Sequence, residues 1–340
     1  MGEYTQADFL FKQVVQESDS VQIKYCNDRI ARIILEYATD IFNDGDYKKS
    51  LKFFQMSLSY YKNGIVDYDF EQQIYYDIAC VTHILNGLEK STEYFNISLK
   101  AIEKDAYNVE YRTAKAYGDY GSFLYDQGLK EDSVIFLKNV ISILTKENTD
   151  DYYSAICRLL SIAQREIGQF ISSIKTMQDC IEIQSGMEDI TPDTMSENYH
   201  ALGLSYFMAE KYEEAEEAAN KALELNPEVN KAGAANILNL LALISKNLGN
   251  YDKAVEYYKN RISVLKNIDD EDARSAIADT LDDLATLQYQ LDRNEEAIGY
   301  FNEGLGCIEG EENSKALFSG MCYRLARCQR DSGDANSAVD

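Results

Sequence analysis

The sequence predicts an all-α protein, a solenoid of about eight antiparallel helix pairs, and three observations support this prediction. Pairs of small residues recur along the chain, always 12 positions apart. Glycine-containing turn sequences lie between the two members of most pairs. Only two prolines occur in 340 residues, so long helices can run without interruption. A regular succession of helix, turn and helix is typical of a repeat protein.

All members of the recurring pairs are glycine, alanine or serine. The pairs are Ala38/Ser50, Ala79/Ser91, Gly121/Ser133, Ser161/Ser173, Gly203/Ala215, Ala242/Ala254, Ala285/Ala297 and Ala326/Ala338. Two antiparallel helices joined by a short turn approach closely only where their side chains are small. We therefore expect the two members of each pair to touch. First members of successive pairs are 39 to 43 residues apart, which predicts one helix pair per interval.

The turn inside each pair has a recurring sequence, a glycine followed after one residue by an aromatic side chain. It is clearest in Gly45-Asp46-Tyr47, Gly168-Gln169-Phe170 and Gly249-Asn250-Tyr251. Glycine suits the positive φ angle with which a helix commonly ends. The aromatic residue then begins the second helix and packs back on the first. Glu210-Lys211-Tyr212 keeps only the tyrosine.

The stretch from Glu197 to Pro227 shows the repeated unit most completely. Its characteristic residues are Tyr199, Leu202, Gly203, Tyr206, Ala215, Ala222 and Pro227. This pattern resembles the tetratricopeptide repeat (TPR) family, whose helix pair carries an aromatic residue, Leu-Gly, a tyrosine, two alanines and a closing proline. The resemblance implies a right-handed superhelical solenoid whose first helices line a concave inner surface.

The repeat length differs from the 34 residues usual in that family. A period of about 40–42 residues resembles kinesin light chains, Pins-type polarity adaptors and the Rap-type bacterial regulators that sense peptides. Rap phosphatases place their catalytic apparatus in a helical bundle before the repeats. This chain enters the repeats within its first few residues, so the resemblance does not carry that activity over.

The repeats predict one TPR array over residues 1–340. Its parts are the second helix of an incomplete leading repeat or an N-terminal cap (1–18), seven repeats (28–65, 69–105, 111–147, 151–186, 193–227, 231–268 and 274–309) and an incomplete last repeat (314–340). A terminal repeat normally has a polar cap, because an unfinished stack exposes apolar surface. No cap follows Ala338, so we expect the array to be part of a longer protein. A natural terminus with a frayed last helix is the alternative.

Composition narrows the classes of partner. A formal net charge of −25 argues against nucleic acid and against anionic membranes, which need clustered lysine and arginine. No run of apolar residues is long enough to span a membrane. The seven cysteines include no CxxC pair, a pattern that indicates reduced thiols in a cytoplasmic protein.

Sequence motifs for catalysis are missing. The two histidines, His83 and His200, fall in different repeats, and no metalloprotease, nucleophile-elbow or phosphate-loop motif occurs. Adjacent acidic residues are numerous but are expected on any solvated helix face. We therefore predict a non-enzymatic protein without a catalytic residue, a metal site or a small-molecule cofactor.

The family resemblance also implies which residues face inward and could bind a partner. These are Arg158, Arg165, His200, Leu204, Phe207, Asn239, Leu243, Lys246, Asn247 and Tyr289. The apolar members would form a floor, the cations would bind an anionic group, and the asparagines would pair with a peptide backbone. In the alternative interpretation, the arginines pair with neighbouring acids such as Glu166 and the aromatic residues only fill helix packing.

These residues favour a module that recognises an extended peptide or partner segment in its groove and has a regulatory role. A second hypothesis makes the chain the sensor half of a multidomain signalling enzyme, a kinase, cyclase or protease, whose catalytic domain lies beyond residue 340. A third makes it an architectural scaffold that binds partners through its acidic convex face.

Overall fold

The computed structural model describes residues 20–105, 107–144, 151–187, 189–227, 229–268, 271–308, 310 and 314–333. Within these residues there are fifteen helices and no strand, which confirms the all-α prediction. The chain forms two compact units, Met1–Asn148 (unit 1) and Thr149–Asp340 (unit 2). The helix expected over residues 1–18, and Ala338 of the last small-residue pair, lie outside the described residues.

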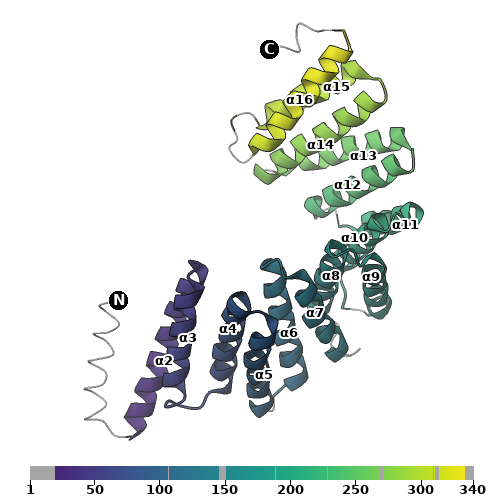
Figure 1. The fold of residues 1–340 in the computed structure, drawn as a ribbon. Helices are drawn as coiled ribbons and strands as arrows, with labels where there is room; N and C mark the ends of the chain where they lie inside the picture. Colours follow the sequence, from purple (N-terminus) through teal and green to yellow (C-terminus); the bar gives the residue numbers. More distant parts are fainter. Residues whose placement is uncertain are drawn as a thin grey trace. The chain divides into compact units, whose positions relative to one another are not determined.

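The described helices of unit 1 form three successive pairs (Figure 1). They are α2 (Ser20–Asn43), α3 (Tyr47–Tyr61), α4 (Tyr68–Asn86), α5 (Leu88–Asp105), α6 (Val109–Asp126) and α7 (Lys130–Ile143). Phe54 of α3 and Ile74 of α4 belong to one buried cluster, which joins the first pair to the second. Phe95, Tyr120 and Phe136 form a second cluster across α5, α6 and α7.

Unit 2 continues the same arrangement with four pairs and one further first helix. Its helices are α8 (Asp151–Glu166), α9 (Phe170–Gln184), α10 (Pro192–Met208), α11 (Tyr212–Leu225), α12 (Lys231–Asn247), α13 (Tyr251–Leu265), α14 (Glu271–Gln290), α15 (Asn294–Ile308) and α16 (Lys315–Asp331). From α10 onward, buried clusters join one pair to the next, for example Ala219 with Leu241 and Tyr258 with Leu281. Each unit is a helical solenoid.

The turns inside the pairs have the predicted geometry. Gly45, Gly168 and Gly249 have φ angles of 82°, 76° and 76°, in the left-handed region that favours glycine. Glu210 and Asp292 occupy the equivalent place with φ angles of 59° and 57°. The turn geometry is therefore kept even where glycine is not, because the hairpin contacts around it determine the backbone.

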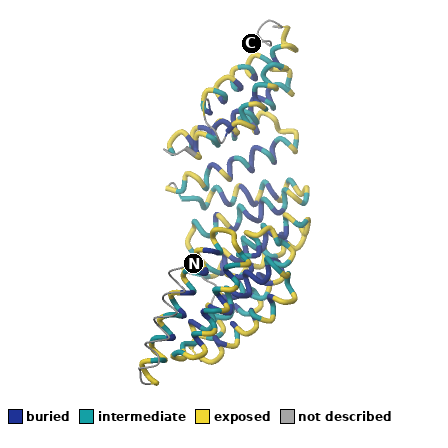
Figure 2. The backbone as a smooth tube through the Cα atoms, turned by 60° about the vertical axis from the view of Figure 1, so that its left-hand side comes forward, coloured by how far each residue is buried: buried dark blue, intermediate teal, exposed yellow. Residues whose placement is uncertain are grey.

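Close contact between the members of a small-residue pair is confirmed for Gly121/Ser133, Ser161/Ser173 and Gly203/Ala215. Both members of the first seven pairs are buried. The hydroxyl oxygens of Ser161 and Ser173 are 2.7 Å apart, and Ser133 Oγ donates to Gly121 O at 2.7 Å. Figure 2 shows buried residues along the middle of the helices and exposed residues at their ends and turns. The hydrophobic core of each unit therefore consists of successive buried clusters along the middle of the helices.

Gly121 provides a direct test of the requirement for small residues. A Cβ atom on Gly121 would lie 2.8 Å from Cγ and Cδ2 of Leu137, on the facing helix α7. A Gly121→Leu substitution would push α6 and α7 apart. We expect it to lower the free energy of unfolding by about 2–3 kcal/mol in urea titrations.

The matched control is Gly299→Leu on α15, where no described atom lies within 4 Å of an added Cβ. We expect this variant to raise the free energy of unfolding by about 0.5–1 kcal/mol, because leucine has a higher helix propensity than glycine. Equal unfolding midpoints for the two variants would show that the helix contacts do not depend on small side chains.

Candidate functional site

The ten predicted binding residues all lie on first helices of unit 2, namely α8, α10, α12 and α14. We call the surface formed by these ten residues the first-helix face. Neighbouring first helices are in contact. Arg158 of α8 donates to Asn198 of α10 at 2.9 Å. A Cβ atom on Gly203 of α10 would lie 3.1 Å from Leu240 Cδ2 of α12.

Arg158 is held by two side chains of the next first helix. Its Nη1 donates to Asn198 Oδ1, and its Nη2 lies 2.8 Å from Glu197 Oε2. The alternative interpretation, in which the arginines pair with acids of the protein itself, therefore applies to Arg158, with Glu197 as the acid. A partner's anionic group would have to compete with Glu197 for this guanidinium.

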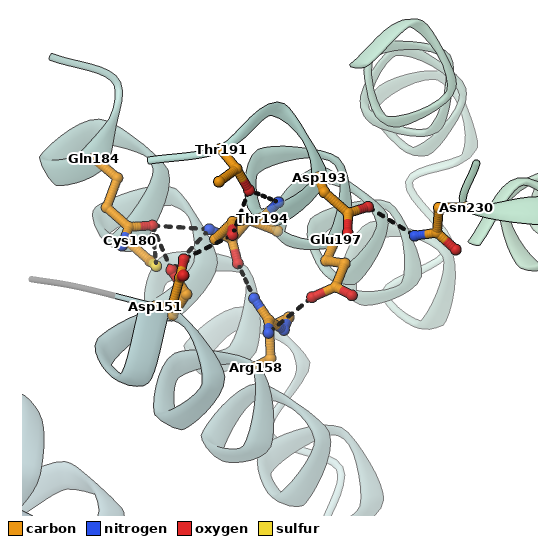
Figure 3. A network of polar contacts seen from close by, with 11 residues as sticks. Asp151, Arg158, Cys180, Gln184, Thr191, Asp193, Thr194, Glu197 and Asn230 are labelled. Carbon is orange, nitrogen blue, oxygen red and sulfur yellow. Dashed lines mark hydrogen bonds and ion pairs between the residues drawn. The ribbon is translucent and has the colours of Figure 1, made fainter. Parts of the chain in front are cut away.

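A buried polar network lies behind Arg158 (Figure 3). Asn198 Nδ2 donates to Gln184 Oε1 at 2.9 Å, and Ser154 Oγ donates to the same oxygen at 2.6 Å. Asn198, Gln184 and Ser154 are at most 1% exposed. The Asn198 amide of α10 thus connects three helices, because it donates to Gln184 of α9 and accepts from Arg158 of α8. This network fixes the position of Arg158 on the first-helix face.

Arg165 lies two turns of α8 further on, over a cluster of three buried serines. Its Nη1 donates to Ser161 Oγ at 2.8 Å and to Ser205 Oγ at 3.2 Å. Ser173 Oγ is 2.7 Å from Ser205 Oγ. The serines of the small-residue pair therefore contribute hydrogen bonds as well as small volume, and they hold this second arginine against α10.

His200 of α10 is neutral at physiological pH. Burial, and to a smaller extent the nearby charge of Arg165, lowers its pKa to about 4. A histidine whose pKa is lower in the folded state stabilises the fold above the pKa of its unfolded state, near 6.5. That contribution is lost as the pH falls from about 6.5 towards 4.

We therefore expect acidification from pH 7 to pH 5 to destabilise the wild type by about 2 kcal/mol more than a His200→Gln variant. Urea unfolding at the two pH values measures this difference. The C2 proton of His200, assigned by its absence from the variant spectrum, should titrate near pH 4. Titration near 6.5 would contradict this account of the site.

Asn239 of α12 is paired with an arginine that the sequence analysis did not include. Arg261 of the second helix α13 donates from Nη1 to Asn239 Oδ1 at 2.9 Å. Its buried Nε has no hydrogen-bond partner among the described residues. On α14, burial raises the pKa of Asp279 and of Asp283 above the usual range. Arg261 and Lys246 partly offset this shift for Asp283, so α12, α13 and α14 share a compact group of opposite charges.

The predicted apolar floor is half-buried. Leu204 and Phe207 of α10 pack against a buried cluster formed by α11 and α12, and the Phe207 ring lies 5.8 Å from the Tyr212 ring. Leu243 of α12 is also half-buried, and the adjacent Met208 side chain is 45% exposed. Apolar surface therefore remains open on α10 and α12.

Lys246 and Asn247 end α12, and Asn247 is exposed. Asn247 Nδ2 donates to Leu243 O of its own helix at 2.8 Å. Tyr289 near the end of α14 has a different environment, because its hydroxyl donates to Asp331 of α16 and Arg327 lies 5.7 Å from its ring. Tyr289 therefore belongs to the packing between α14 and α16.

Sequence reasoning missed Asn198, Gln184 and Arg261, which form hydrogen bonds with residues of the first helices. Asp282 forms a two-bond ion pair with Arg324 of α16, at 2.9 and 2.6 Å. A signal was available, since Asp282 and Arg324 are 42 residues apart and Arg158 and Asn198 are 40 apart. These separations are close to one repeat, so they place the partners side by side on successive first helices.

The described part of the chain has neither a metal-binding cluster nor a helix that could cross a membrane. No group of three or more histidine, cysteine, aspartate or glutamate side chains there is arranged to hold a metal ion. None of its helices combines the length and apolar character needed to cross a bilayer.

Comparison with known families agrees with the repeat geometry described above. A tetratricopeptide repeat family model matches residues 196–229, and a second matches residues 233–309. The chain contains tetratricopeptide repeats. It is a protein-interaction module, as such repeats are in general.

The tetratricopeptide repeats have relatives of known sequence and structure. The TPR repeat-containing protein MJ1428 of Methanocaldococcus jannaschii is 20% identical, over 78% of this chain and 50% of that protein. This chain therefore spans about half the length of that curated relative. The crystal structure of the apo form of RapI covers 91% of this chain and 95% of that one, with a TM-score of 0.52 and 11% identity. At this identity the similarity shows the fold alone.

The C-terminal part of a TPR repeat-containing protein from Cytophaga hutchinsonii is a further similar structure. It covers 83% of this chain and 98% of that chain, with 16% identity and a TM-score of 0.47.

Proposed function

We propose that the first-helix face of unit 2 binds an extended peptide or a partner segment. The observation that carries this proposal is the open apolar surface of α10 and α12, formed by Leu204, Phe207, Met208 and Leu243. These side chains are half-buried or exposed although they adjoin a buried core. Apolar side chains grouped between polar ones are typical of a surface that a partner covers.

The polar side chains at the end of α12 favour an extended backbone as the ligand. The Asn247 amide donates to Leu243 O, and its Oδ1 atom can accept a peptide N–H. Lys246 offers a cation beside the apolar surface. Arg158 is already oriented by Asn198 and Glu197, so little conformational entropy is lost when a ligand contacts it.

We further propose that this binding is regulatory and takes place in the cytoplasm. A surface that holds a partner segment can control the partner's availability without any chemistry of its own. Cys80, Cys157, Cys180 and Cys328 are buried and free, which suits a reducing compartment.

The test compares two variants that change the same dipeptide on neighbouring helices. Lys246→Glu/Asn247→Ala alters the first-helix face, whereas Lys259→Glu/Asn260→Ala alters exposed residues of the second helix α13. Both variants and the wild type are applied to an array of short, unmodified peptides of varied sequence. Peptides that bind the wild type should bind the first variant about tenfold more weakly and the second within about twofold.

Equal affinity for the wild type and both variants would remove the peptide-binding proposal. An equal loss of affinity in both variants would show that binding depends on the net charge of the protein and not on the first-helix face. Arg158 and Asn239 are poor choices for this test, because each has a partner within the protein and its loss would also disturb helix packing.

A further inference from the structure

An open groove lies on another side of the α10–α11 pair. Its volume is about 670 Å³, and residues of α10 and α11 line it. The side chains of Tyr199, Leu202 and Tyr206 contribute from α10. Tyr206 is two residues from Leu204, or roughly 160° around the helix axis, so this α10–α11 groove is separate from the first-helix face.

The α11 side of the groove is acidic. Glu214, Glu217 and Glu224 are exposed and line it, together with one cation, Lys221. Three glutamates and one lysine give the lining a net charge of −2. Lys221 Nζ lies 2.8 Å from Glu224 Oε2, so this cation already has an anionic partner. Glu217 forms no ion pair with any residue that the structure describes.

The α10 side of the groove is apolar with a fixed shape. Leu202 is 8% exposed, and the two tyrosines are half-buried. The Tyr206 hydroxyl accepts a hydrogen bond from Gln178 Nε2 of α9 at 2.9 Å, which orients the ring. Tyrosine rings beside carboxylates suit long cationic side chains, because the aliphatic stem packs on the ring and the charged head reaches the acid.

We propose that the α10–α11 groove binds a lysine- or arginine-bearing segment of a partner protein. The partner's cations pair with Glu217, and they compete with Lys211 for Glu214 and with Lys221 for Glu224. The partner's apolar residues cover the tyrosines. The net charge of −25 attracts such a segment over longer distances. The groove then provides the surface to which the segment binds. This site is independent of the peptide proposed for the first-helix face.

The probe is a short fluorescein-labelled peptide of leucine and lysine, titrated by fluorescence anisotropy in about 0.1 M salt. A peptide with glutamate in place of lysine should not bind. Glu214→Lys/Glu217→Lys should weaken binding of the lysine peptide about tenfold, because two attractive pairs become repulsive.

The matched control is Glu295→Lys/Glu296→Lys, the same charge change in the first turn of α15. We expect it to weaken binding by less than about threefold, through net charge alone. Lys246→Glu/Asn247→Ala should leave the lysine peptide bound. Circular dichroism checks that all the variants are folded.

Three results would overturn this proposal. They are failure of the wild type to bind the lysine peptide, equal weakening by the two glutamate variants, and loss of the lysine peptide in the Lys246→Glu/Asn247→Ala variant. The last result would place the peptide on the first-helix face. The first-helix-face proposal, in contrast, is tested with the array of unmodified peptides. Its failure there would not change the outcome expected for the lysine peptide and the α10–α11 groove.

Discussion

Replacing Tyr120 by alanine is expected to lower the free energy of unfolding by about 3–5 kcal/mol. Tyr120 of α6 is fully buried, with its ring stacked on Phe95 at 4.6 Å and edge-on to Phe136 at 4.7 Å. Its hydroxyl lies 3.2 Å from Nδ1 of the buried His83. The substitution leaves a cavity where three helices meet and removes the aromatic contacts that fill it.

Urea unfolding followed by circular dichroism measures this loss. Tyr120→Phe keeps the ring and removes only the hydroxyl, so we expect it to cost about 1 kcal/mol. Tyr107→Ala is the control, because Tyr107 is 73% exposed and its loss should change stability by less than about 0.5 kcal/mol. A cost for Tyr120→Ala as small as that of Tyr107→Ala would show that this cluster does not stabilise unit 1.

Replacing Asn198 by leucine is expected to lower the free energy of unfolding by about 2–4 kcal/mol. The Asn198 side chain is fully buried, donates to Gln184 Oε1 and accepts from Arg158 Nη1. Leucine has a similar size but can neither donate nor accept a hydrogen bond. Arg158 would keep Glu197 and Gln184 would keep Ser154, so the loss is large but incomplete.

The measurement is the urea midpoint of the Asn198→Leu variant beside that of Asn236→Leu. Asn236 is an exposed residue of α12, and its substitution should be nearly neutral. If Asn198→Leu is as stable as the control, the network behind Arg158 does not hold α8, α9 and α10 together.

Much of the fold could be predicted from the sequence because its determinants are local. Gly121 and Ser133 belong to one hairpin, and the same small-residue spacing recurs in other hairpins. A turn such as Gly168-Gln169-Phe170 involves only the ends of two adjacent helices. Chain connectivity already brings these groups together, so their spacing in the sequence is enough to predict the contact.

The candidate site was predicted less completely. The first helices that carry it could be identified, but Arg261 reaches Asn239 from a second helix, and the acid beside Arg158 is Glu197. A separation of about one repeat indicates candidate partners, but residue type and position do not decide which of them pair. The pairs depend on side-chain rotamers and on the rotation of one helix against the next.

The sequence by itself determined that the chain is a succession of helical hairpins, because small residues and turn residues act within each hairpin. Only the tertiary structure decided which side chains pair between hairpins, and it alone revealed the acidic groove between α10 and α11. The physical reason is that contacts between successive repeats depend on how whole helices pack, and no local pattern in the sequence encodes that packing.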